Sequence, residues 1–210
     1  MRKINKESLV CIVKTKKRFI SILLIVLLGV GFFGGIKATS PDMEDTLDKY
    51  YSDTNFMDFN IKSTWGIDEE FLSYYKDYNI EVGYSVDAIV ELDTEKVAKV
   101  LSYNKYTKIN DVFLLEGRLP VKNDECIVDS NSGLKIGQSI KVKDTFLKEV
   151  ELKVVGLVTS PLYSSIEKGS TNLLNGSISL FIYVLEDNFV MDYYTDIYID
   201  LKTDYHTFSD

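Results

Sequence analysis

The sequence has only one histidine, His206, and only two cysteines, Cys11 and Cys126. Zinc sites are built from clustered Cys and His ligands, so this scarcity excludes a site of that kind. The two cysteines flank a long apolar run. If that run crosses a membrane, they lie on opposite sides of it and cannot form an intramolecular disulfide. We therefore expect no metal site, no other cofactor and no disulfide.

Motifs of familiar catalytic sites are missing as well. No GxSxG nucleophile elbow accompanies His206, which lies close to the chain end, so we interpret it as a solvent-exposed histidine rather than a triad base. The Walker pattern GxxxxGK[ST] is absent, so any ATP energy must come from a partner. Carboxylate pairs such as Asp68 with Glu69, or Glu91 with Asp93, are interpreted as solvated surface. We expect no catalytic residue and no enzymatic activity.

One stretch, Asp129–Gly133 with the sequence DSNSG, begins like a calcium-binding loop. Such a loop requires glycine at its sixth position and an acid at its twelfth, and these positions hold Leu134 and Ile140. The stretch therefore predicts a turn rather than a calcium site.

Positive charge is scarce outside the first 18 residues. That segment holds seven basic residues and one acid, whereas the rest of the chain holds 17 basic and 31 acidic residues, a balance of −14. Binding to phosphate backbones requires clustered Lys and Arg. The acidic body of the protein therefore excludes nucleic acid as a partner.

Residues 19–36 form a run of 18 residues without a charge. As a helix this run would span about 27 Å, close to the roughly 30 Å hydrocarbon core of a bilayer. Signal-peptide cores are shorter, about 7 to 15 residues, and Gly35, Ile36 and Lys37 fit the small-x-small cleavage pattern poorly. We predict a retained transmembrane helix over 19–36, in contact with the lipid bilayer of the cell membrane.

A basic cluster stands directly before the apolar run. By the positive-inside rule it predicts a cytoplasmic segment over residues 1–18 and an extracytoplasmic domain over 37–210. The residues that carry this signal are Lys14, Lys16, Lys17 and Arg18.

Gly31 and Gly35 form a GxxxG pair in the run. Small residues at that spacing allow two membrane helices to pack closely, which would imply further membrane helices as neighbours. A run that contains four glycines also produces the spacing by chance. Both interpretations stay open at this stage.

Strand patterns dominate after the apolar run. Ser40 and Pro41 predict the N-cap and first residue of a new helix, either bent away from the apolar helix or continuing it as a stalk, and Asp68 predicts the cap of a short helix. Alternating apolar residues predict strands at 57–61, 80–86, 88–92, 97–103, 126–129, 139–142, 150–158, 179–185 and 197–201. The fold class is therefore α+β: one transmembrane helix, then a strand-rich domain with a mixed or antiparallel sheet and a few short helices.

Glycine and proline mark expected turns and irregularities between these strands. Gly117 and Pro120 predict a tight turn, and Gly137 predicts a chain reversal. Gly156 lies inside a strand pattern, which predicts a bulge or a close backbone approach. Pro161 cannot donate to a strand ladder and is expected to end that strand.

Five pieces of the sequence occur in a characteristic order: RFISILLIVLLGVGFFGGIKATSPDM from Arg18, DKYYSDTNFMDFNIKSTWGIDEE from Asp48, LLEGRLPVKNDECIVD from Leu114, LKIGQSIKV from Leu134 and LKVVGLVTSPLYSSIEKGST from Leu152. In this order and spacing the chain resembles FtsX-like permeases, the membrane subunits of ABC transporters of the MacB type. The resemblance implies a first membrane helix that leads into a MacB-like extracytoplasmic core domain. It also implies a cytoplasmic ABC ATPase subunit and further membrane helices, of the same or a second permease, as partners.

Permeases of this family have several further membrane helices, whereas this sequence has one apolar run. We interpret the chain as the N-terminal part of such a permease, with a core domain that is incomplete at its C-terminal end. The alternative is a single-pass anchored binding or sensor module whose acidic outer face captures a cationic peptide. An extracellular enzyme that depends on His206 or on a carboxylate pair is the least favoured interpretation.

Overall fold

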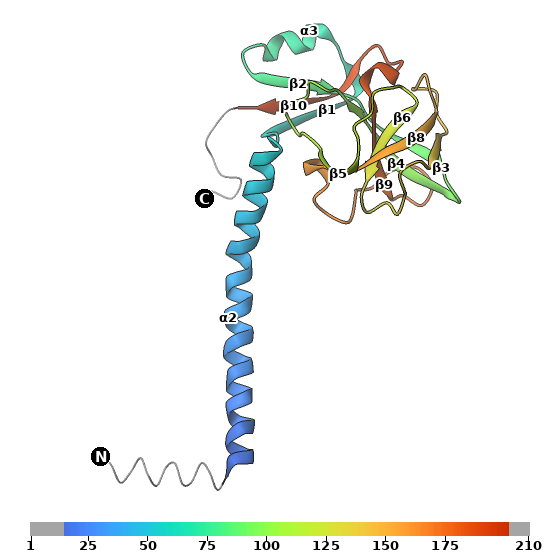
Figure 1. Ribbon diagram of the computed structural model, residues 1–210. Helices are drawn as coiled ribbons and strands as arrows, with labels where there is room; N and C mark the ends of the chain where they lie inside the picture. The colour runs from blue at the N-terminus through green and yellow to red at the C-terminus, as the bar shows by residue number, and fades with distance from the viewer. Residues whose placement is uncertain (1–14, 202–210) are drawn as a thin grey trace. The chain divides into compact units, whose positions relative to one another are not determined.

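The computed structural model describes residues 15–201 (Figure 1). The chain divides into two units between Lys49 and Tyr50. Lys14, Cys11 and His206, which carried sequence-based predictions, lie outside the described residues.

The first unit consists of helix α2, Lys16–Asp53, without its last turn. This helix is long and apolar enough to cross a membrane, and it includes the whole run predicted to do so. Its apolar side chains from Phe19 to Ile36 are exposed in the structure, as a surface that faces lipid would be. Lys16, Lys17 and Arg18 form its first turn.

A new helix does not begin at Ser40 and Pro41, so that prediction is wrong. Helix α2 passes through both residues. Pro41 removes one backbone hydrogen bond, but the Thr39 hydroxyl donates to the Gly35 carbonyl at 2.8 Å, and the Ser40 hydroxyl donates to Glu44 Oε1 at 3.2 Å instead of capping a helix start. The structure has the other alternative, in which the apolar helix continues as a stalk.

The second unit begins with a three-stranded antiparallel sheet in the order β1-β10-β2. Because β10 pairs antiparallel with both neighbours, β1 and β2 run parallel on either side of it, a split β-α-β arrangement. Asp68 caps the connecting helix by accepting from Phe71 N at 2.8 Å, as predicted. Ile67, Ile197 and Ile199 form the buried core under this helix. The elements are β1 (Phe59–Ile67), α3 (Glu69–Leu72), η1 (Ser73–Tyr75), β2 (Asn79–Gly83) and β10 (Tyr194–Asp200).

The larger sheet has seven strands in the order β5-β8-β6-β9-β4-β3-β7, and β7 also pairs with β8. The pairing of β7 with β8 closes six of the strands into a small barrel. The first half of β8 pairs with β7, and its second half pairs with β5, which is not part of the closed barrel. Two pairs, β4 with β9 and β6 with β8, are parallel. The strands are β3 (Ser85–Glu91), β4 (Glu95–Tyr103), β5 (Phe113–Gly117), β6 (Glu125–Asp129), β7 (Ser139–Val142), β8 (Glu151–Thr159) and β9 (Leu180–Leu185), with η2 (Pro161–Tyr163) and η3 (Glu186–Asn188) in the connections.

Every second residue of the barrel strands belongs to one fully packed core cluster. The alternation explains why the sequence pattern predicted these strands well. Small residues such as Ala88 and Ala98 lie beside larger ones, which lets a narrow barrel fill its interior. The buried members from the strands are Ala88, Val90, Ala98, Val100, Cys126, Val128, Ile140, Val142, Leu152, Val154, Leu180, Ile182 and Val184.

The predicted fold class is confirmed, with two local corrections. The strand predicted over 80–86 is divided between the two sheets at Tyr84, whose backbone N–H bonds the Ser102 hydroxyl instead of a strand partner. The alternation continues across this break, so the pattern could not reveal it. Strand β5 was missed because its residues are mostly exposed and do not alternate. The close approach predicted at Gly156 is confirmed, because a Cβ there would lie 2.5 Å from the Arg118 carbonyl oxygen.

Candidate functional site

The connection between β4 and β5 contacts two separate parts of the second unit. Its first eight residues, 104–111, begin with a turn in which Thr107 N donates to the Asn104 carbonyl at 3.0 Å. The Asn104 side chain fixes the same turn by accepting from Tyr106 N at 3.0 Å. We refer to residues 104–111 as the bridging loop.

One side of the bridging loop holds the chain where it leaves helix α2. Asn110 N and Asp111 N donate to the carbonyls of Asn55 and Thr54, both at 2.9 Å. Asn55 Nδ2 donates to the Lys108 carbonyl at 2.6 Å. Asn110 Oδ1 accepts from the backbone N–H of Met57 at 3.0 Å. We call this set of four hydrogen bonds, all within the second unit, the exit clasp.

The other side of the bridging loop borders a pocket of about 360 Å³. Its apolar lining comes from the small sheet and its helix, and its polar lining comes from the bridging loop, from η3 and from Glu81 of β2. Two carboxylates, Glu81 and Glu186, belong to the lining, so we call it the acid-walled pocket. The lining residues are Leu72, Ile80, Glu81, Val82, Asn104, Tyr106, Thr107 and Glu186.

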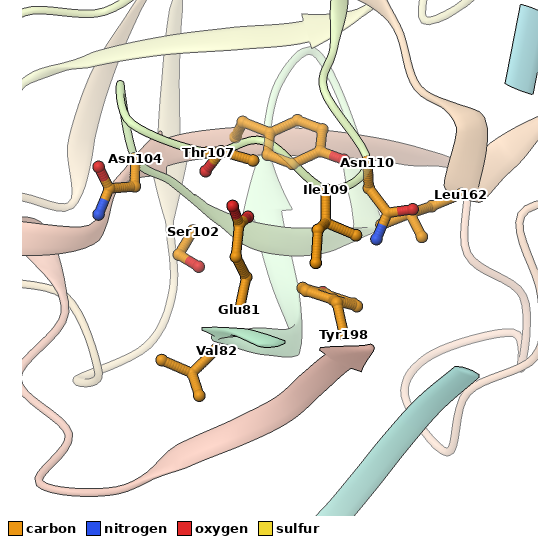
Figure 2. Close-up of a pocket in the computed structure, with 10 residues that line it drawn as sticks. Glu81, Val82, Ser102, Asn104, Thr107, Ile109, Asn110, Leu162 and Tyr198 are labelled. Atoms are coloured by element: carbon orange, nitrogen blue, oxygen red, sulfur yellow. The ribbon is translucent and has the colours of Figure 1, made fainter. Parts of the chain in front are cut away.

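Glu81 extends from β2 towards the bridging loop (Figure 2). Its Oε1 accepts from Lys108 N at 2.6 Å. Partial burial raises the pKa of Glu81, and the nearby charge of Asp111 adds to this rise, while backbone N–H groups of Lys108 and Ile109 oppose it. Because the ionised Glu81 carboxylate is partly removed from water, a cation beside it would stabilise its charge.

Glu186 approaches the same pocket from the first residue of η3. Its Oε2 accepts from Asn104 Nδ2 at 2.7 Å, so the amide that shapes the loop also positions this carboxylate. Tyr106, whose side chain is largely exposed, lies on the pocket wall between loop and solvent. The two carboxylates and one aromatic ring thus line a single pocket.

A smaller cavity of about 30 Å³ adjoins the acid-walled pocket and shares Glu81, Val82, Asn104 and Thr107 with it (Figure 2). Its remaining lining residues are Ser102, Ile109, Asn110, Leu162, Tyr183 and Tyr198. Asn110 is buried, and its Nδ2 has no hydrogen-bond acceptor in the part of the chain that the structure describes. Burying an amide donor without an acceptor costs free energy, so this group favours an oxygen atom in the cavity.

The stretch Asp129–Gly133 is a turn, as predicted. Asp129 Oδ1 accepts from Asn131 N at 3.0 Å, and Asp129 Oδ2 lies 3.2 Å from Lys168 Nζ. Its carboxylate is therefore committed to the protein rather than free to bind an ion. Within residues 15–201, no group of three or more His, Cys, Asp or Glu side chains is arranged to hold a metal ion.

The carboxylate pairs weighed from the sequence are not brought together as acid and base. Asp68 caps a helix, and Glu91 lies 3.6 Å from Lys143 Nζ at an exposed surface. Cys126 is a free, buried cysteine, and burial raises the pKa of its thiol to about 12. Its side chain acts as a small apolar member of the barrel core.

Gly31 and Gly35 both lie on α2 with open space around them. A Cβ added to either would meet nothing within 4 Å in the described structure. The close helix contact that their spacing suggests stays a prediction, as does the orientation signal of Lys16, Lys17 and Arg18.

The residues of the acid-walled pocket were not singled out in the sequence. Glu81 and Glu186 are far apart in the chain and meet only because η3 follows β9 beside the bridging loop. A weak signal existed at Asn104, because an Asn followed by Lys and Tyr after a buried strand is typical of a turn. Nothing in the sequence linked that turn to either carboxylate.

No protein-family model matches the chain, and no curated protein matches it. Among solved structures it is similar to the extracellular domain of a noncanonic ABC-type transporter, YknZ, from Gram-positive bacteria. The two share 11% sequence identity with a TM-score of 0.43, over 70% of this chain and 82% of that one. A likeness of this size carries no functional argument for the present chain.

Proposed function

We propose that this chain is the N-terminal part of an ABC transporter permease subunit of the FtsX-like, MacB type. In this proposal α2 crosses the cell membrane with its N-terminus in the cytoplasm, and the strand-rich unit is the extracytoplasmic core domain. A separate cytoplasmic ATPase supplies the energy, and the chain itself is not an enzyme. Support comes from the order of the five sequence pieces and from a long apolar helix that leads directly into a two-sheet domain.

The observation that carries the proposal is the exit clasp. Asn55 and Met57 directly follow α2, and each is bonded to Asn110 or Lys108 within the domain. A connection of this kind is short and hydrogen-bonded rather than a flexible linker. A movement of the membrane helix would therefore be passed to the bridging loop, as expected for a permease whose outer domain responds to ATP hydrolysis.

The proposal predicts a gene for an ABC ATPase beside this one, and its test is reconstitution of the chain with that ATPase. Asn55→Ala with Asn110→Ala removes the two side chains of the exit clasp and should abolish coupled conformational change in the outer domain while leaving basal ATP hydrolysis intact. A disulfide between cysteines introduced at positions 55 and 108 should instead preserve the coupling. The matched control places a cysteine pair at Ser139 and Lys153, which are register partners within the barrel and should have no effect when linked. If no ATPase gene lies beside this one, or if breaking the exit clasp leaves the coupled conformational change unaltered, the permease proposal fails.

Topology provides an independent test. Reporter fusions after Leu9 and after Asp144 should report cytoplasm and exterior, respectively, because the basic residues precede the apolar run. The same side for both fusions would contradict the proposed orientation.

A second candidate function is an anchored sensor or binding module, and the acid-walled pocket favours it. A stop codon directly after Asp210 with no ATPase gene nearby would support this candidate. An open reading frame that continues into further apolar runs of about 20 residues would support the permease.

A further inference from the structure

We propose that the acid-walled pocket binds a cation at the end of an aliphatic stem, of the kind carried by a lysine side chain. This binding site goes beyond the permease proposal and does not depend on it. Glu81 and Glu186 supply the negative charge, and Leu72, Ile80 and Val82 supply an apolar surface for the stem. The volume of about 360 Å³ lies within the usual range for small-ligand pockets.

The carboxylates are suited to this role because neither forms an ion pair within residues 15–201, where ion pairs form at other carboxylates such as Asp87, Asp129 and Asp196. Glu81 accepts from the backbone N–H groups of Lys108 and Ile109, with the Lys108 charge nearby, and Glu186 accepts from the Asn104 amide. Neutral donors orient a carboxylate but leave its charge. The pocket therefore presents two negative charges to a ligand at positions that the protein has already fixed.

Tyr106 adds a ring at the pocket wall. Lys105 Nζ lies 4.8 Å from the ring centroid, so a ligand cation at this ring would replace the Lys105 contact. An aromatic ring beside two carboxylates is a favourable environment for an ammonium or guanidinium group. The lining thus combines three features that select for positive charge on an apolar stem.

The adjoining cavity provides a second, independent indication of a ligand. Asn110 Nδ2 is buried, lacks an acceptor in the described chain and lines the 30 Å³ cavity, which opens onto the same Glu81. A cavity of this size has room for one water or one ligand oxygen.

The site also has a route to the exit clasp. Asn110 lines the smaller cavity, where its Nδ2 has no acceptor in the described chain, and its Oδ1 accepts from Met57 N. Glu81 bonds Lys108, whose carbonyl accepts from Asn55. A ligand that orders the bridging loop on the pocket side would therefore also order it on the clasp side.

Binding is tested with the full chain in lipid nanodiscs and two cationic probes, tri-lysine and cadaverine, followed by isothermal titration calorimetry. Glu81→Gln and Glu186→Gln keep side-chain shape but remove a charge, and each should weaken tri-lysine binding by about tenfold. Glu116→Gln, an exposed carboxylate on β5, is the matched control and should leave the affinity unchanged. Fully acetylated tri-lysine should not bind.

Equal losses in all three variants would overturn the site, because they would mean that only the overall negative charge attracts the probe. Binding of acetylated tri-lysine would overturn it as well. Thermal unfolding of each variant verifies that it folds. Because Glu186 and Glu81 lie on different elements, the two substitutions test the site independently. Tighter binding of tri-lysine than of cadaverine would assign the cation to a peptide, and the reverse order would assign it to a free amine.

The link to the exit clasp is tested by hydrogen exchange of the Asn110 and Asp111 amides, which donate into the clasp. Saturating tri-lysine should slow their exchange several-fold in the unmodified chain and leave it unchanged in Glu81→Gln. Unchanged exchange in both proteins would overturn the link and leave the binding result standing.

Discussion

Asp129 and Lys168 form a buried ion pair, in which Lys168 Nζ lies 3.2 Å from Asp129 Oδ2 and both side chains are almost fully buried. Lys168 Nζ also donates to the Ser165 carbonyl at 3.2 Å and lies 5.2 Å from the centroid of the Phe181 ring. The pair joins the end of β6 to the long connection between β8 and β9. It fixes that connection against the outer face of the barrel.

Lys168→Met should destabilise the second unit by about 3–5 kcal/mol, because it leaves the Asp129 carboxylate buried without a counter-charge. Urea unfolding of the full chain in nanodiscs, followed by circular dichroism, measures the change. The control is Lys143→Met, which breaks an exposed pair with Glu95 and should have little effect. An equally small loss of unfolding free energy in both variants would show that the buried ion pair does not stabilise the second unit.

Glu125 should make the stability of the second unit depend on acid. The hydrogen bond from the Arg118 guanidinium lowers the pKa of Glu125 from 4.5 to about 2, with the Val121 N–H assisting. The unfolded chain therefore takes up a proton first, so this contribution is complete above about pH 4.5 and is lost as the pH falls towards 2.

The measurement for Glu125 compares the urea midpoint of the original chain and Glu125→Gln at about pH 6 and about pH 3. The advantage of the original chain should shrink at the lower pH, since the glutamine cannot titrate. Glu116→Gln controls for loss of a surface charge. A constant difference across the pH range would mean that Arg118 does not hold Glu125 ionised.

Gly156→Ala should destabilise the second unit by about 3 kcal/mol, the upper end of the cost of overpacking. An added Cβ would lie 2.5 Å from the Arg118 carbonyl oxygen and 3.0 Å from Leu114 Cδ1. Gly133→Ala is the comparison, because Gly133 has a φ of +77° and open space around it, so only backbone strain of about 1 kcal/mol applies. Thermal or urea unfolding should rank the two variants in this order. A larger loss at Gly133 would contradict the close approach.

Gly31→Leu with Gly35→Leu should weaken assembly of α2 with other membrane helices, because the larger side chains keep backbones apart. Gly29→Leu is the matched control, since Gly29 lies on the opposite side of the helix from Gly31. Cross-linking yield in native membranes measures assembly. An equal yield for all variants would reduce the glycine spacing to coincidence.

Much of the fold could be predicted from the sequence because apolar residues alternate along the strands and form the barrel interior, although some strands, such as β6 and β9, are buried on both faces. Val97 to Tyr103 alternates between interior and exterior, and the observed β4 spans Glu95–Tyr103. Helix boundaries were harder to predict. Ser40 and Pro41 predict a helix start, but α2 passes through both residues. The alternation of apolar residues predicts which side of a strand is buried, but it does not predict which sheet the strand joins.

The acid-walled pocket could not be predicted from the sequence, because it depends on contacts between distant segments. Glu81 and Glu186 each look like ordinary surface acids in their own stretch. Asn110 gives a partial clue, since it adopts a left-handed φ of 58°, which asparagine tolerates better than most residues. Only the bridging loop brings these three residues to one place.

The first and last strands of the second unit are neighbours. Phe59 of β1 is the register partner of Ile199 of β10, and Leu201 N donates to Asp58 Oδ2 at 2.7 Å. The strand that follows α2 and the last strand described are therefore hydrogen-bonded to each other along their length. A pull on the chain at Asp58 or at Leu201 acts first on the same pair of strands.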